Sequence, residues 1–155
     1  MKNTIKVMGF TILVIIILLG AGMAFLAILG RTLDKESKAY VDAAVPAIIA
    51  EWDINELEKR ASPEFNEGAD YEKIEQMFVM LQRLGKLEEY NGSAGDASIT
   101  ISFTGFEISA EYTAIADFET ASAEIQISLI KHGRRWQILG FRIRPVSFSE
   151  RNDIV

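Results

Sequence analysis

The chain of 155 residues contains no cysteine and a single histidine, His132. Without thiols it forms no disulfide and has no cysteine to carry a lipid, which excludes a lipoprotein anchor. One imidazole and no thiolate leave zinc, haem and thiol chemistry without ligands, and no loop gathers enough acids for a carboxylate metal site. The sequence therefore predicts no metal, no other cofactor and no catalytic residue.

Basic residues are also in the minority, because 16 Lys and Arg stand against 22 Asp and Glu. An acidic chain repels a phosphate backbone, so we do not expect nucleic acid as a partner. The charges are uneven: residues 51–75 are rich in carboxylates, whereas residues 131–144 hold five basic residues and no acidic one. This asymmetry fits opposite surfaces of one soluble domain better than it fits two partner faces.

The run from Val7 to Gly30 contains no charged residue, no Asn and no Gln. As a helix it would measure roughly 36 Å at about 1.5 Å per residue, longer than the roughly 30 Å hydrocarbon core of a bilayer. We predict a short tail over residues 1–6, a transmembrane helix over 7–30 and a linker over 31–37. The lipid bilayer is then the first expected partner.

A cleavable signal peptide is the alternative, because Lys2 and Lys6 precede the run and Gly22-Met23-Ala24 has the small-x-small form of a cleavage site. We prefer a signal-anchor, since the run continues to Leu29, well past the usual apolar region of a signal peptide. Basic residues flank both ends in nearly equal number, so the orientation with the domain outside rests mainly on the short tail.

Within the run, Gly20, Ala24 and Ala27 share one side of the predicted helix at i, i+4 and i+7. Small residues at this spacing allow two helices to approach closely in lipid. The stripe predicts a membrane helix contact, either with another membrane protein or with a second copy of the chain.

Beyond the linker, apolar residues first recur at helical spacing and later alternate with polar residues. Apolar residues at helical spacing predict three helices, over residues 34–52, 53–61 and 70–84. Pro46 should kink or restart the first helix. Asp70 is the expected N-cap of the third helix, and Gly85 should close it. Ser62-Pro63 is expected to end the second helix, and residues 66–69 and 92–95 to form a loop and a turn.

Alternating residues predict strands over 98–103, 110–118, 123–129 and 136–143, with a turn at His132-Gly133 and a β-bulge near Gly140. Helices followed by strands indicate an α+β domain over residues 38–146, with the helices covering one face of a curved antiparallel sheet, and a tail over 147–155.

Several segments, in this order, resemble a known group of domains: residues 52–65, Leu84-Gly85-Lys86-Leu87, and residues 133–141, which read GRRWQILGF. Together they resemble the small bacterial membrane-anchored cystatin-like domains of the nuclear transport factor two-like superfamily. The resemblance implies a long helix and two shorter ones packed into a cone-shaped sheet. It implies no activity, because that superfamily includes enzymes, ligand binders and interaction modules.

A pocket inside such a cone would be lined by Tyr112, Phe118 and Trp136. The small inward residues of the strands, namely Ala110, Ala114, Ala116 and Ala123, either leave such a cavity or let a helix approach closely, and we favour close packing. His132 is expected to be exposed in its turn rather than catalytic.

Asp117 and Glu111 could form a carboxylate pair if their face lined the cone. The alternation instead turns them to the solvent face, where we expect them to meet Arg142 and Arg144. The sequence thus favours a membrane-anchored, extracytoplasmic, non-enzymatic interaction module of a cell inner membrane, as an accessory subunit of a membrane assembly. A small-ligand-binding or weakly catalytic domain is the alternative.

Overall fold

The computed structural model describes residues 2–103 and 105–146. The chain forms two compact units, Met1–Leu33 and Asp34–Val155, which we call the N-terminal unit and the sheet unit. Helix α1 (Lys2–Ile49) contributes to both. No expectation for the tail at 147–155 is tested, because it lies outside the described residues.

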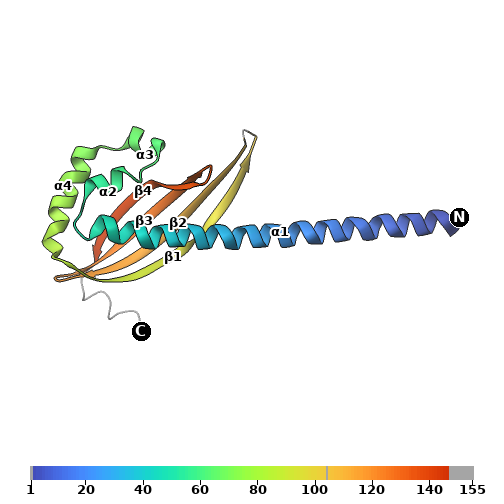
Figure 1. The fold of residues 1–155 in the computed structure, drawn as a ribbon, viewed down its shortest axis with the longest axis horizontal. Helices are drawn as coiled ribbons and strands as arrows, with labels where there is room; N and C mark the ends of the chain where they lie inside the picture. The colour runs from blue at the N-terminus through green and yellow to red at the C-terminus, as the bar shows by residue number, and fades with distance from the viewer. Residues whose placement is uncertain (1, 104, 147–155) are drawn as a thin grey trace. The chain divides into compact units, whose positions relative to one another are not determined.

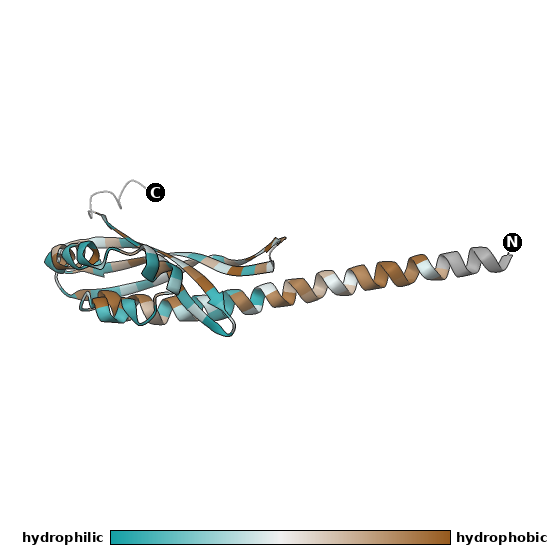
Figure 2. Ribbon diagram, turned by 90° about the horizontal axis from the view of Figure 1, so that it is seen from above, coloured by the Kyte–Doolittle hydropathy of each residue, from teal (hydrophilic) through white to brown (hydrophobic). Residues whose placement is uncertain are grey.

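The N-terminal unit is helical over all its described residues. From Phe10 to Ile28 every residue is exposed. Most of this stretch is coloured hydrophobic in Figure 2, with paler turns between. Among the described residues, α1 is the one helix long and apolar enough to cross a membrane, judged by length and composition. The N-terminal unit is thus compatible with membrane anchoring.

The sheet unit contains four antiparallel strands in the order β1-β2-β3-β4, each hydrogen-bonded to the next. The strands are β1 (Leu87–Ser102), β2 (Gly105–Phe118), β3 (Ser122–His132) and β4 (Arg135–Val146). Figure 1 shows them as a meander with helices at one end and one face. The α+β class expected from the sequence is confirmed.

The core of the sheet unit lies between the sheet and the part of α1 that follows Asp34. From α1, Val41, Val45, Ile48 and Ile49 are fully buried. The strands supply alternate residues: on β2 and β3 these are Ala110, Tyr112, Ala114, Ala116, Phe118, Ala123, Ile125, Ile127 and Leu129. The four alanines are at most 2% exposed. They therefore open no cavity to solvent.

The short helices begin where local capping signals place them. Asp53 caps α2 (Ile54–Glu58) by accepting a hydrogen bond from the Asn55 N–H, and Asp70 caps α4 (Tyr71–Leu81), which continues as the 3₁₀ turn η1 (Gln82–Leu84). Gly85 follows with a φ of 83°, which confirms its predicted closing role.

Ser62-Pro63 starts a helix instead of ending one, so that prediction is wrong. The helix is α3 (Pro63–Gly68), and it also occupies most of the loop expected at 66–69. Ser62 Oγ accepts the Phe65 N–H at 3.2 Å, and a proline in the first turn gives up no helical hydrogen bond. The same two residues suit either end of a helix, and only their surroundings decided which.

Pro46 does not divide the helix, which contradicts the expected restart. Helix α1 continues to Ile49, and the Ala50 N–H reaches the Pro46 carbonyl at 3.0 Å. Burial of Val45, Ile48 and Ile49 holds this last turn against the sheet. Residues 31–37, assigned to a linker, are likewise helical parts of α1.

The Gly92–Gly95 segment is not a turn, which corrects a further prediction. It lies inside β1, and a register shift between Tyr90 and Ser93 places a bulge at Gly92, whose φ is 83°. A Cβ at Gly95 would stand 1.9 Å from the carbonyl oxygen of Glu111. Glycine is present here because β2 passes too close for a side chain.

The bulge predicted near Gly140 is confirmed. Ser128 pairs with Gly140 and Leu129 pairs with Ile138, which leaves Leu139 as the extra residue of β4. Beyond β4, the Ser62 N–H donates to the Ile138 carbonyl at 2.8 Å, so residues next to α3 cover part of this sheet edge.

Candidate functional site

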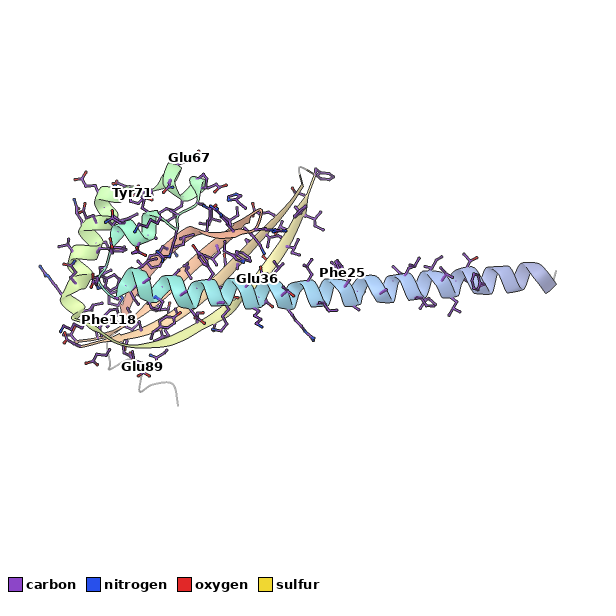
Figure 3. All side chains as sticks on the ribbon, in the orientation of Figure 1. Phe25, Glu36, Glu67, Tyr71, Glu89 and Phe118 are labelled. Carbon is purple, nitrogen blue, oxygen red and sulfur yellow. The ribbon has the colours of Figure 1, made fainter. Side chains whose placement is uncertain are left out.

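The small-residue stripe lies on one side of α1, because the segment holding Gly20, Ala24 and Ala27 is helical. All three residues are exposed, and a Cβ at Gly20 would meet nothing within 4 Å. Small residues with open space around them leave the helix backbone accessible to a second helix. Large apolar side chains such as Phe25, 67% exposed, project elsewhere from the same helix (Figure 3).

The three aromatic residues expected to line a pocket are spread through the core. Tyr112 and Phe118 stand six positions apart on β2, roughly 20 Å at about 3.3 Å per residue. Phe118 is fully buried and stacks on Trp52 with ring centroids 5.3 Å apart. Trp136 contacts another residue, Lys131, whose ammonium lies 5.2 Å from the centroid of the Trp136 ring. Their burial makes them core residues, and Tyr112 and Trp136 line two different cavities.

The Tyr112 hydroxyl is held by α1. It donates to the Asp34 carbonyl at 3.1 Å and lies 2.9 Å from Ser37 Oγ, and Ser37 is fully buried. The phenol therefore ties the helix to the sheet, and burial raises its pKa.

Asp117 and Glu111 do face away from the core, but their expected partners are wrong. Asp117 accepts hydrogen bonds from Asn91 at 2.8 Å and from Ser122 at 2.6 Å. Arg144 pairs with Glu124 at 3.2 Å, because these two residues are cross-strand neighbours on β4 and β3. Strand β3 lies between β2 and β4, which the alternation of a single strand does not reveal.

His132 is exposed at the end of β3, as expected. Its Nε2 lies 3.1 Å from Glu64 and its Nδ1 lies 3.0 Å from the Gln137 amide oxygen. The imidazole thus links the β3–β4 turn to α3. Over residues 2–103 and 105–146, no three His, Asp or Glu side chains gather closely enough to hold a metal ion.

A polar cluster that the sequence did not reveal joins α1 to β1, and we call it the Asp42 cluster. Asp42 Oδ1 accepts hydrogen bonds from Tyr90 at 2.8 Å and from Ser93 at 2.6 Å, and Oδ2 pairs with Lys38 at 2.8 Å. Lys38 also donates to the Ser93 carbonyl at 2.6 Å. The i,i+4 spacing of Lys38 and Asp42 was a visible signal, but the contact with β1 was not.

The electrostatics of the Asp42 cluster favour an ionised carboxylate beside a neutral phenol. Burial alone would raise the pKa of Asp42, but the hydrogen bonds from Lys38, Ser93 and Tyr90 together hold it below its usual value. Burial, and then the adjacent carboxylate, raise the pKa of Tyr90 far above its ordinary range. This arrangement fixes the helix on the sheet edge and activates no group for proton transfer.

Strand β1 is an edge of the sheet, and α1 covers part of it. The Ala97 N–H donates to Asp34 Oδ1 at 2.8 Å, and the Ser93 carbonyl accepts from Lys38. Backbone groups that would otherwise invite another strand are thereby occupied.

An open cavity of about 820 Å³ crosses all four strands, with Phe65 of α3 at its border. Glu111, Thr113, Gln126 and Arg142 contribute exposed polar side chains to it. Its breadth and polar walls suit a polypeptide surface better than an apolar small molecule.

Comparison of this chain with protein-family models, with curated proteins and with solved structures found no match.

Proposed function

We propose that this protein is a single-span membrane protein whose sheet unit is a non-enzymatic interaction module on the extracytoplasmic side of a cell inner membrane. Its partner is another membrane protein or a second copy, and it acts as an accessory subunit. We further propose that the sheet unit is a cystatin-like cone of the nuclear transport factor two-like superfamily, which the helix lying across a four-stranded antiparallel sheet supports.

The observation that carries the proposal is the exposed apolar surface of α1 between Phe10 and Ile28. Soluble proteins rarely leave apolar patches above a few hundred Å² in water, so a fully exposed helix of this length calls for lipid. The small-residue stripe adds a surface through which the anchor can meet a second helix.

The test uses the absence of cysteine, since any single cysteine introduced is a unique label. After alkaline carbonate washing, the full chain is expected in the membrane pellet. Ala24→Cys, in the stripe, is expected to cross-link to a second copy or to a stoichiometric partner on oxidation or with a thiol-reactive cross-linker. Leu26→Cys, about 200° further round the helix, is the matched control that should cross-link poorly.

Orientation is tested by an impermeant maleimide applied to intact spheroplasts of cells carrying Glu67→Cys, since Glu67 is exposed on α3. Labelling before lysis supports an extracytoplasmic sheet unit. Release by carbonate, or a first residue near position 25 in the mature chain, contradicts the anchor. A chain that stays monomeric without any cross-linked partner contradicts the interaction module.

A further inference from the structure

The β1–β2 and β3–β4 turns lie at the same end of the sheet (Figure 1). Contacts with the first residues of α1 in the sheet unit mark that end: Ala97 of β1 bonds to Asp34, and Lys131 of β3 pairs with Glu36 at 2.6 Å. The opposite end carries α4 and the β2–β3 turn, where the Thr120 N–H donates to the Leu84 carbonyl. The chain therefore enters the sheet unit at the end that holds the β1–β2 and β3–β4 turns.

The tip of the β1–β2 hairpin is apolar and exposed. Ile101 is 83% exposed, Phe106 is 75% exposed and Phe103 is fully exposed. Ile101 and Phe106 are direct cross-strand partners, so their side chains share one face of the hairpin. Within the described part of the sheet unit, the other large apolar residues with comparable exposure are Val79 and Met80 of α4, away from this end.

The hairpin extends beyond the first residues of α1 in the sheet unit. Lys38 contacts Ser93 and Asp34 contacts Ala97, so β1 runs antiparallel to α1 and continues past the level of Asp34. From Ala97 to Phe103 the strand advances roughly 20 Å at about 3.3 Å per residue. The end of the uncharged run at Gly30 is four residues from Asp34, a stretch that spans at most roughly 14 Å in any conformation. With the anchor as proposed, the sheet unit is therefore tethered close to the lipid at the end that carries the tip.

The β3–β4 turn presents positive charge at the same end. Arg134 and Arg135 are exposed, and neither has an ion-pair partner among the described residues. They border a cavity of about 650 Å³, which Trp136 also lines with an indole N–H that is buried and has no hydrogen-bond partner among the described atoms. Guanidinium groups of this kind attract the phosphates of anionic headgroups.

We propose that this end of the sheet unit docks on the membrane: the β1–β2 tip, with Ile101, Phe103 and Phe106, inserts into the interfacial region of the bilayer, and Arg134 and Arg135 contact anionic headgroups. The inference rests on the proposed anchor. Aromatic and aliphatic side chains next to basic groups are the composition that interfacial lipid binding requires. Docking fixes the orientation of the sheet unit, and with it that of the open polar cavity, relative to the membrane.

The test uses the full chain in vesicles of phosphatidylethanolamine and phosphatidylglycerol, with an environment-sensitive fluorophore on a single cysteine. Ser102→Cys reports on the tip, Ile16→Cys on the anchor and Glu67→Cys, exposed on α3 (Figure 3), on solvent. Lipids carrying nitroxide on the acyl chain are expected to quench positions 16 and 102 and to leave position 67 bright.

Two variants read out the docking contacts. Phe103→Ser with Phe106→Ser is expected to abolish the lipid quenching at position 102 without changing the unfolding midpoint, since both side chains are exposed. Arg134→Gln with Arg135→Gln is expected to remove the dependence of that quenching on phosphatidylglycerol.

The outcomes separate the two proposals. Quenching at 16 without quenching at 102 overturns the docked hairpin and leaves the anchor standing, whereas quenching at neither position overturns the anchor itself. Shielding of position 102 from aqueous iodide without lipid quenching would mean that a second copy or another protein covers the tip, and this also overturns docking on lipid.

Discussion

The Asp42 cluster should hold α1 on the sheet, and Asp42→Ala tests this. The substitution removes the acceptor of Tyr90 and Ser93, each hydrogen bond being worth about 1 kcal/mol net. The Lys38 pair adds about 0.5 kcal/mol because the side chains are 47% and 34% exposed. The higher helix propensity of alanine returns about 0.5 kcal/mol. The expected net loss is therefore about 2 kcal/mol, or roughly 8 °C in the unfolding midpoint.

Tryptophan fluorescence provides the assay, because both tryptophans, Trp52 and Trp136, belong to the sheet unit. Unfolding of the full chain in detergent by urea, followed at these two side chains, reports on the sheet unit alone. Lys35→Ala is the matched control, since Lys35 is exposed on the same helix; its stability should stay within about 0.5 kcal/mol of the parent.

Tyr90→Phe completes a double-mutant cycle with Asp42→Ala. Alone it should cost about 1 kcal/mol, and it should cost much less once the carboxylate is gone. The reasoning is refuted if Asp42→Ala is as stable as the Lys35→Ala control, or if the cost of Tyr90→Phe is the same in both backgrounds.

Three further predictions concern the sheet unit. Phe118→Ala should cost about 3–5 kcal/mol in urea unfolding, because it leaves a cavity beside Trp52. Gly95→Ala should lower the free energy of unfolding by at least about 1–3 kcal/mol, since its Cβ would meet a backbone oxygen at 1.9 Å. Gly140→Ala is the control and should be nearly neutral, because its Cβ would lie 3.4 Å from a side-chain oxygen. Equal effects of the two substitutions would contradict the close approach of β2 to Gly95. The free energy of unfolding should change little with pH near neutrality and should fall at both extremes of pH. The pKa of the Asp42 carboxyl is lowered in the folded state, so this group contributes stability above pH 3.8, and that stability is lost as the pH falls through the folded pKa. The pKa of the Tyr90 phenol is raised in the folded state, so this group contributes stability below pH 10.0, and that stability is lost as the pH rises through the folded pKa. Tyr90→Phe should weaken the alkaline component, to which Tyr112 also contributes through its raised pKa, and an unchanged alkaline limb in that variant would count against this reasoning.

Local signals in the sequence were sufficient for several features. The uncharged run needs only its own length to be recognised as a candidate membrane span. Asp70 and Gly85 bracket their helix because capping and a positive φ involve neighbouring residues. The alternation of the strands and the bulge beside Gly140 likewise depend on side-chain period within one strand.

The tertiary structure decided everything that depends on which segments meet. Gly95 looks like a turn residue until β2 is seen to pass against it, and Ser62-Pro63 suits either end of a helix until the chain around it is placed. The period of a strand shows which side chains share a face, but strand order sets their partners, which is why Arg144 meets Glu124 and not Asp117. The contact of Asp42 with Tyr90 of β1 joins residues 48 positions apart, for which no local pattern exists. The placing of an apolar and a basic turn at one end follows from the pairing of the four strands in sequence order.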